Sequence, residues 1–314
     1  MQRTRVAVIG AGYLGRFHAQ KYASLEGCEL VAVVDPRAAV CESVAAELRT
    51  APLAEHQSLL GGQVDAVSIV TPTPAHFAIA RDFLEAGVHV LVEKPITETA
   101  AQARELIAIA TRRGKLLQVG HLERFNAAIL AAEPYLSSPR FIECQRLAPF
   151  KERGTDVSVV LDLMIHDIDI VQNIVGAEIE SIEAIGTRVF SQDTDIANAR
   201  LRFADGCIAN VTASRVSVKT ERKLRLFRDD AYVSIDLQQK ILTVIRKREG
   251  GAAAPGGLPV TIEEKSFEQG DALRTEIESF LDCIRLGRRP VVGGEAGLRA
   301  LETAMRITAE LSGA

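Results

Sequence analysis

The stretch that decides the fold is Val6-Ala7-Val8-Ile9-Gly10-Ala11-Gly12-Tyr13-Leu14-Gly15. Its apolar beginning predicts a buried strand, and its glycines form G-x-G-x-x-G where an amphipathic stretch begins. In such a strand–turn–helix unit, the first glycine permits a tight turn, the second lets backbone approach a pyrophosphate, and the third lets helix and strand pack closely. Amides at the helix N-terminus would bind the phosphates. We therefore predict a dinucleotide site that uses Gly10, Gly12, Tyr13, Leu14 and Gly15.

Asp35 and Arg37 bear on the choice of dinucleotide. Asp35 ends the second apolar run, where a carboxylate meets the adenosine ribose hydroxyls. Because a carboxylate repels the 2′-phosphate of NADP, we expect NAD as the cofactor, with NADP less favoured. Arg37 leaves this open, because it could pair with that phosphate, stack on adenine, or be a solvated arginine at a helix start.

Outward from this unit, strand and helix patterns alternate as far as residue 120. Repeated strand–helix–strand units predict a doubly wound parallel sheet, a Rossmann domain over residues 1–120. After residue 121, consecutive strand patterns with short turns predict an α+β domain with a large open, mainly antiparallel sheet. The fold class is therefore α/β with a second, α+β domain. Predicted strands in the first part are 5–9, 30–34, 64–70, 88–92 and 116–119, and predicted helices there are 13–25, 38–49, 75–86 and 99–113.

Composition excludes several classes of protein. The 314 residues include 37 Lys and Arg against 41 Asp and Glu, so 37 − 41 gives a net charge of −4, which argues against a basic nucleic-acid binder. No apolar run is long enough to span a bilayer, so we expect no membrane partner. The five cysteines form no Cys-x-x-Cys pair, which indicates reduced thiols in a cytoplasmic protein rather than a disulfide scaffold or zinc site.

Further polar residues follow the third and fourth predicted strands. Thr71, Pro72 and His76 come after the third, and Glu93-Lys94-Pro95 ends the fourth. Carboxyl ends of parallel strands are where ligands bind, so these side chains are candidates for contacts with the cofactor. His76 has the alternative of packing locally at a helix start. Lys94 could also stabilise a developing alkoxide with its charge.

A second reactive cluster contains Asp162 and His166. These residues are four apart in a predicted helix over 157–175, so the helix places them on one face. A histidine can accept a hydroxyl proton, while a carboxylate orients it. A surface ion pair is the alternative, but apolar flanking residues favour a buried helix. Without a third ligand motif, we expect no metal.

The glycine motif, Glu93-Lys94-Pro95 and Asp162-x-x-x-His166 together resemble the glucose–fructose oxidoreductase/inositol dehydrogenase (Gfo/Idh/MocA) family over essentially the whole chain. The resemblance implies NAD(P)-dependent oxidation or reduction of a ring hydroxyl of a sugar or cyclitol. It implies Lys94, Asp162 and His166 as the catalytic trio. It also implies a substrate-binding and oligomerisation domain over residues 121–290, with a C-terminal helix in 291–314 packing back toward the Rossmann domain.

Two further segments, residues 120–126 and 149–156, resemble nucleotide-sugar members of this family. This implies oxidation of the C3 hydroxyl of UDP-N-acetylglucosamine for the diamino sugars of lipid A, by a homodimer or homotetramer. Arg124, Lys151 and Arg153 could neutralise a diphosphate. Alternatives are a dehydrogenase of a free sugar or inositol, and a catalytically silent cofactor-binding regulator. The full set of expected substrate contacts is Lys94, His121, Arg124, Phe125, Asn126, Lys151, Arg153, Asp162 and His166.

Overall fold

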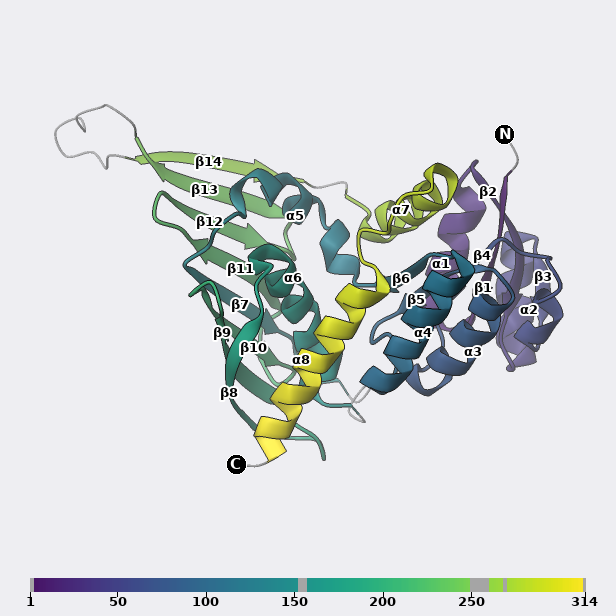
Figure 1. Cartoon of the computed structure of the whole chain (residues 1–314), viewed down its shortest axis with the longest axis horizontal. Helices are drawn as coiled ribbons and strands as arrows, with labels where there is room; N and C mark the ends of the chain where they lie inside the picture. Colours follow the sequence, from purple (N-terminus) through teal and green to yellow (C-terminus); the bar gives the residue numbers. More distant parts are fainter. Residues whose placement is uncertain (1–2, 152–156, 249–259, 268–269, 313–314) are drawn as a thin grey trace. The chain divides into compact units, whose positions relative to one another are not determined.

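The computed structural model describes residues 3–151, 157–248, 260–267 and 270–312, and the chain forms two compact units (Figure 1). The first unit contains Met1–Leu122 and Ala272–Leu301, and the second contains Glu123–Asp271 and Glu302–Ala314. The division after Leu122 lies close to the boundary expected near residue 120.

The first unit is built on a six-stranded parallel sheet with the order β3-β2-β1-β4-β5-β6. This is a doubly wound order, as predicted, and ligands bind such sheets where the order reverses, beside β1 and β4. The short strand β3 is not among the predicted strands, because it contains Pro52 and is mostly exposed at the edge of the sheet. The strands are β1 (Thr4–Ile9), β2 (Cys28–Val34), β3 (Ala51–Leu53), β4 (Ala66–Ile69), β5 (His89–Glu93) and β6 (Leu117–Gly120).

Four helices connect these strands, as the alternating pattern predicted. They are α1 (Tyr13–Ser24), α2 (Ala38–Leu48), α3 (Thr73–Glu85) and α4 (Ala100–Arg113). The bounds of α4 show how local chemistry sets them. Thr99 and Gln102 exchange side-chain and backbone hydrogen bonds in a capping box, and Gly114 ends the helix with φ of 62°.

Helix α7 (Ala272–Leu286) also belongs to the first unit, although it lies far along the chain. Leu273, Ile277 and Phe280 are buried in the same apolar core as Val6 and Val33 of the parallel sheet. Sequence reasoning had placed α7 in the second domain. An amphipathic pattern reveals an apolar face, but it does not reveal which sheet that face covers.

Helix α8 (Gly294–Ser312) begins in the first unit, and the division between the units falls after its Leu301. Its first turn packs tightly on the parallel sheet. A Cβ at Gly297 would lie 2.6 Å from the side chain of Val119, and one at Gly294 would lie 2.7 Å from that of Ile107. Glycine at these two positions therefore lets the helix backbone approach β6 and α4.

The second unit is built on an eight-stranded sheet with the order β14-β13-β12-β11-β7-β10-β9-β8. Only β7 and β10 pair in parallel, so the sheet is mainly antiparallel, as predicted. Strand β14 is largely exposed and polar, so no apolar pattern in the sequence predicted it. The strands are β7 (Phe141–Leu147), β8 (Ile179–Thr187), β9 (Ile196–Phe203), β10 (Ile208–Ser214), β11 (Glu221–Phe227), β12 (Ala231–Asp236), β13 (Ile241–Lys247) and β14 (Val260–Ser266). The stretch over residues 250–257, whose glycine-rich composition predicts a surface loop, lies outside the described residues.

Helices α5 (Ala127–Ala132) and α6 (Ile165–Val175) lie against the same face of this sheet (Figure 1). The helix predicted over 157–175 is interrupted, since Val160–Met164 forms a π-helical turn before α6 begins. Single π turns inside helices are frequent at functional sites.

Candidate functional site

The three glycines of the first loop have three different surroundings. Gly10 adopts φ of +97°, and a Cβ there would lie 2.5 Å from the carbonyl oxygen of Val70. A Cβ at Gly15 would lie 1.8 Å from the carbonyl oxygen of Gly10, so only glycine fits where α1 meets the loop. A Cβ at Gly12 would meet nothing nearer than Arg37 Nη2 at 3.6 Å. The protein itself therefore needs Gly10 and Gly15, whereas Gly12 leaves open space at the N-terminus of α1, as a bound pyrophosphate would require.

Asp35, at the end of β2, faces this loop. Its buried carboxylate accepts a hydrogen bond from the backbone N–H of Ala11 at 2.9 Å, and it accepts Arg37 Nε and Nη2 at 2.8 Å each. Hydrogen bonding from Arg37 holds the pKa of Asp35 below its ordinary value. The Arg37 side chain is 63% exposed, so it can exchange for ribose hydroxyls at small free-energy cost.

A surface hollow of about 690 Å³ borders the same loop. Gly12, Arg37 and Ser43 line it, together with the exposed aromatic pair Tyr13 and Phe17. The predicted cofactor residues of the first two strand ends are thus grouped in one region of the first unit. They are Gly10, Gly12, Tyr13, Leu14, Gly15, Asp35 and Arg37.

The loops after β4 and β5 are joined by His76. Its Nδ1 lies 2.9 Å from the carbonyl oxygen of Pro95, and its Nε2 lies 2.9 Å from that of Thr71. Burial lowers the pKa of His76, although these two carbonyls act in the opposite direction. His76 therefore links the Thr71-Pro72 loop to the turn that carries Lys94. The described contacts give it this structural use, and its predicted contact with the cofactor stays a prediction.

Lys94 sits at the carboxyl end of β5 in the first unit, and its bond to Pro95 is cis. Asp162 and His166 belong to the second unit, where Asp162 lies in the π turn and His166 in the first turn of α6. Both side chains are partly exposed, whereas the neighbouring Met164 and Ile165 are buried in the unit's core. The helix thus presents its two reactive side chains away from its apolar contacts.

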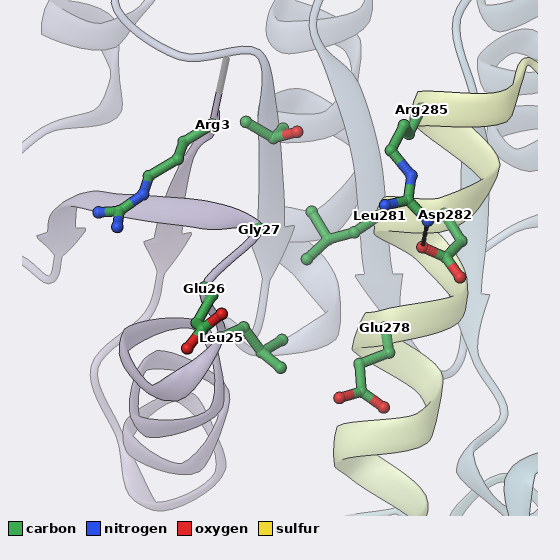
Figure 2. A pocket seen from close by; sticks show the side chains of 9 residues that line it. Arg3, Leu25, Glu26, Gly27, Glu278, Leu281, Asp282 and Arg285 are labelled. Atoms are coloured by element: carbon green, nitrogen blue, oxygen red, sulfur yellow. Dashed lines mark hydrogen bonds and ion pairs between the residues drawn. The ribbon is translucent and has the colours of Figure 1, made fainter. Parts of the chain in front are cut away.

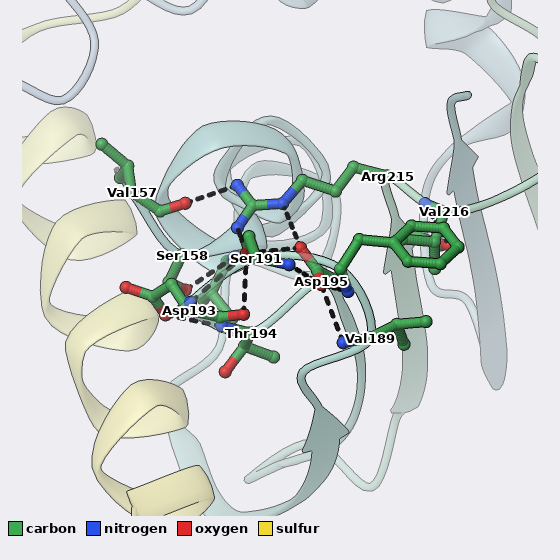
Figure 3. Close-up of polar contacts among 12 residues, drawn as sticks. Val157, Ser158, Val189, Ser191, Asp193, Thr194, Asp195, Arg215 and Val216 are labelled. Atoms are coloured by element: carbon green, nitrogen blue, oxygen red, sulfur yellow. Dashed lines mark hydrogen bonds and ion pairs between the residues drawn. The ribbon is translucent and has the colours of Figure 1, made fainter. Parts of the chain in front are cut away.

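The entry to this helix is held by a buried ion pair (Figure 3). Arg215 donates through Nε to Asp195 at 2.8 Å and through Nη1 to the carbonyl oxygen of Val157 at 2.5 Å. The backbone N–H of Val159 also donates to the carbonyl oxygen of Thr194 at 3.0 Å. The loop before β9 therefore anchors the residues just ahead of the π turn.

Two of the predicted substrate residues are engaged within the second unit. Arg124 is buried and donates to Asn173 at 2.6 Å and to Asp169 at 3.5 Å. The side chain of Asn126 caps α5 and donates to the carbonyl oxygen of Leu237 at 3.0 Å. These contacts give both side chains a structural use, so their substrate contacts stay predictions.

The other predicted substrate residues have varied surroundings. His121 and Phe125 are buried, and Lys151 is exposed. Arg153 lies outside the described residues.

The sequence did not reveal a buried charge cluster that joins Asp167 of α6 to Arg146 of β7. Arg146 donates to both oxygens of Asp167 at 2.8 Å each and to Glu123 at 2.8 Å. Burial opposes ionisation of Glu123, but the charges of Arg146 and Arg222 outweigh it and lower the pKa of Glu123. A signal existed, because Arg146 occupies an inward position of the alternating strand β7. Such buried charges must be paired.

A second hollow, of about 780 Å³, lies at the amino ends of β1 and β2 (Figure 2). Leu25 and Leu281 contribute its apolar part, and charges of both signs, including Arg3 and Asp282, surround them. It lies at the sheet edge opposite the glycine loop, so it is not a candidate for the dinucleotide.

No three His, Cys, Asp or Glu side chains among the described residues come together in a way that would hold a metal ion. Within the same residues, no helix is both long and apolar enough to cross a membrane.

The doubly wound sheet and its glycine loop define a dinucleotide-binding protein of the Rossmann type. Two family models match the chain, one described as an oxidoreductase family with an NAD-binding Rossmann fold over residues 4–121, the other as the GFO/IDH/MocA C-terminal domain over residues 129–234. The chain belongs to the Gfo/Idh/MocA family of oxidoreductases, as its motifs predicted.

Individual relatives agree with the family models. The chain is 41% identical to a UDP-N-acetylglucosamine 3-dehydrogenase of Acidithiobacillus ferrooxidans over 98% of this chain and 97% of that protein. A solved structure of that enzyme superposes with a TM-score of 0.93 at 40% identity, covering 100% of this chain and 99% of the other. A scyllo-inositol 2-dehydrogenase of Bacillus subtilis is 28% identical over 92% of this chain and 89% of that protein.

Proposed function

We propose that this protein oxidises the C3 hydroxyl of UDP-N-acetylglucosamine to the 3-keto sugar, with NAD as the oxidant. The observation that carries the proposal is the 41% identity to a UDP-N-acetylglucosamine 3-dehydrogenase along almost the entire length of both chains. The inositol dehydrogenases among its relatives share less, with 28% identity for the one from Bacillus subtilis. The substrate is therefore assigned from the more similar relative.

In the proposed reaction, three side chains act on one hydroxyl group. His166 accepts the hydroxyl proton, Asp162 orients His166, and the charge of Lys94 stabilises the oxygen as it becomes negative. The chemistry that NAD would supply when bound is acceptance of the hydride from the sugar carbon. The loop from Gly10 to Gly15 and the carboxylate of Asp35 hold the dinucleotide.

We also propose NAD rather than NADP. The support is the position of Asp35, whose carboxylate is oriented toward the glycine loop through the N–H of Ala11. A buried negative group there favours ribose hydroxyls over a phosphate. We expect kcat/KM to be higher with NAD than with NADP. An Asp35→Ala variant should reduce this preference, measured as kcat/KM with NAD divided by kcat/KM with NADP. A wild-type preference for NADP would overturn this part of the proposal.

Substrate turnover tests the main proposal. The purified protein is mixed with NAD and, separately, with UDP-N-acetylglucosamine, free N-acetylglucosamine, glucose and myo-inositol, while nicotinamide reduction is followed by absorbance. We expect reduction with the UDP-sugar, with mass spectrometry showing a product two hydrogens lighter. Turnover of myo-inositol or a free sugar alone would establish the alternative dehydrogenase. Absence of turnover with any sugar, together with NAD binding, would favour a silent regulator.

Two substitutions test the assigned catalytic residues. Lys94→Ala and His166→Asn should each lower kcat by about 100-fold or more, because each removes a charge or proton acceptor used in the transition state. NAD binding, measured by fluorescence titration, should stay within about threefold of the wild type, since neither residue holds the pyrophosphate. Normal turnover in both variants would disprove the assignment.

We further propose that the product supplies lipid A diamino-sugar synthesis in the cytoplasm. The five cysteines are all buried and unpaired with one another, which supports a reducing compartment.

A homo-oligomer is also proposed, through the face of the eight-stranded sheet opposite α5 and α6. Phe141, Phe227 and Tyr232 form a ladder across three strands on that face, with successive ring centroids 5.7 and 5.2 Å apart, and all three are partly exposed. Partly exposed aromatic clusters are typical of interfaces between subunits.

A further inference from the structure

A group of buried polar side chains lies behind the strand end that carries Lys94, entirely within the first unit. Glu93 immediately precedes Lys94, and its carboxylate has contacts on two sides. Its Oε1 lies 3.1 Å from Nε2 of His18 in α1, while its Oε2 accepts the backbone N–H of Lys94 at 3.3 Å. Glu93 therefore connects helix α1 to the turn that bears Lys94.

Glu93 has little room to move. It pairs with Gly120 in the parallel register of β5 and β6, and a Cβ at Gly120 would lie 2.9 Å from its Oε1. The carboxylate is thus held between the backbone of β6 and the ring of His18. Because the N–H of Lys94 donates to this carboxylate, a group that attracts or repels the carboxylate will also move the Lys94 turn.

Glu276 is a second buried acid of this unit, on helix α7, which packs against α1. It is fully buried, and neither of its carboxyl oxygens has a hydrogen-bond partner among the described residues. Burial, and secondarily the negative charge of Glu93, raise the pKa of Glu276 well above its ordinary value. An ionised carboxylate here would have no donor to stabilise it, and it would repel Glu93.

A neutral carboxylic acid would instead supply a donor that this region lacks. The amide of Gln118 donates to the backbone carbonyl of Glu276 at 3.4 Å, yet its own Oε1 has no partner in the described part of the chain. His18 Nδ1 is likewise buried without a hydrogen bond there. Because Glu93 can only accept, Nε2 of His18 donates to it, which leaves Nδ1 of a neutral ring as a further acceptor. The proton of Glu276, through a buried water, matches these acceptors.

We propose that Glu276, as a neutral carboxylic acid, and His18 are positioning residues that hold the Glu93 carboxylate and, through it, the Lys94 turn. The inference rests on the proposed function, in which Lys94 acts on the reacting hydroxyl. It adds two residues, in α1 and α7, that touch neither substrate nor cofactor. They act by fixing where the lysine backbone lies.

Three variants of helix α7 test this inference. Glu276→Gln keeps a neutral, hydrogen-bonding side chain of the same shape, Glu276→Leu removes the donor, and Glu278→Gln changes a partly exposed acid on the same helix as a matched control. Each is assayed for kcat, NAD affinity and thermal midpoint, with the substrate that the wild type oxidises. Infrared difference spectra at neutral pH detect the carbonyl stretch of a protonated carboxyl group.

The expected results separate positioning from mere stability. The wild type and Glu278→Gln should show a protonated-carboxyl band that Glu276→Gln lacks, and Glu276→Gln should keep kcat within about twofold. Glu276→Leu should lower kcat by about tenfold, while the dissociation constant of NAD stays within about twofold, because a misplaced Lys94 affects chemistry rather than cofactor binding.

Three outcomes would overturn the inference. One is an identical infrared spectrum for the wild type and Glu276→Gln. Another is a loss of kcat in Glu276→Gln as large as in Glu276→Leu, and the last is wild-type kcat in Glu276→Leu. If Glu276→Leu does not fold, the infrared band and the kcat of Glu276→Gln decide between a neutral and an ionised acid. A wild type inactive on UDP-N-acetylglucosamine but active on another sugar contradicts the proposed substrate alone.

Discussion

Gly12 and Gly15 are the same residue type three positions apart, yet alanine should affect them differently. A Cβ at Gly15 would clash with backbone at 1.8 Å, whereas one at Gly12 would find open space. We expect Gly15→Ala to lower both NAD affinity and the thermal midpoint. Gly12→Ala should lower NAD affinity by about tenfold or more while leaving the midpoint of the cofactor-free protein nearly unchanged.

Calorimetry without cofactor and NAD titration together measure this difference. Gly62→Ala is a further comparison, because φ of +84° there strains a side chain without any nearby atom or any relation to the loop. It should lower stability and leave NAD affinity unchanged. A Gly12→Ala variant that binds NAD as tightly as the wild type would show that the pyrophosphate does not approach this backbone.

At the scale of single residues, the sequence could predict those features whose geometry is set by residues nearby in the chain. The glycine loop and Asp35 were predictable because a turn and the strand before it determine their geometry. The ion pair of Asp35 with Arg37 was left open, since an exposed side chain has several alternatives. Glu276 went unnoticed because its burial depends on α7 packing against a sheet that ends about 150 residues earlier in the chain.

Among the elements, the π turn and α6 depend most on a neighbouring loop. Asp195 is fully buried, its Oδ2 accepts three backbone N–H groups at 2.6 to 2.9 Å, and its Oδ1 accepts Arg215 Nε at 2.8 Å. Asp195→Asn would leave Arg215 without its charge partner and would turn an amide NH₂ toward one set of these donors. We expect a loss of about 2–4 kcal/mol of unfolding free energy, together with reduced kcat, because the entry to α6 loosens.

Asp193→Asn is the matched control for this loop. Among the described residues, the Asp193 side chain accepts only the N–H of Thr194, at 2.7 Å, and Asp193 is partly exposed. Its substitution should change unfolding free energy by less than about 1 kcal/mol. Equal denaturant midpoints for the two variants would contradict the anchoring role of Asp195.

The Asp195 carboxylate also makes the unfolding free energy depend on pH. Backbone and side-chain hydrogen bonds, with Arg215, hold the pKa of Asp195 well below its ordinary value despite burial. A group whose folded pKa is lowered stabilises the fold fully above its unfolded pKa of about 3.9, and this contribution fades as pH falls below that value. The difference in unfolding free energy between wild type and Asp195→Asn should therefore stay constant from about pH 8 to 5.5 and shrink below about pH 4. A difference that grows on acidification would contradict this assignment.

Helix positions were predicted well from periodicity, but the π turn was not. A residue pattern with Asp162 and His166 four apart fits a continuous α-helix, and nothing in it marks a change of hydrogen bonding. The turn arises where the helix start is held by Ser158, whose Oγ accepts the N–H of Val160 at 3.1 Å and whose carbonyl oxygen accepts the N–H of Asp162 at 3.0 Å. Such a tertiary constraint lies outside what a local pattern contains.

At the scale of the whole molecule, the chain alternates between its two units. It leaves the first unit after Leu122, returns at Ala272, and passes into the second again within α8. Folding of the first unit therefore requires chain on both sides of the second. The alternation of strands and helices predicted the parallel sheet correctly, and the consecutive strand patterns predicted the antiparallel one. The return of α7 depended on which core could accept Leu273, Ile277 and Phe280.

The proposed oligomer would form through the uncovered face of the eight-stranded sheet. Helices α5 and α6 cover one face, while Phe227 lies on the other beside Phe141 and Tyr232. We expect light scattering after size exclusion to show a dimer or tetramer, and Phe227→Glu to shift it to a smaller species, because an interface cannot bury an unpaired carboxylate. Leu130→Glu places the same charge at an exposed apolar position on α5 and should leave the mass unchanged. If Leu130→Glu dissociates the assembly and Phe227→Glu does not, subunits meet through the helical face instead.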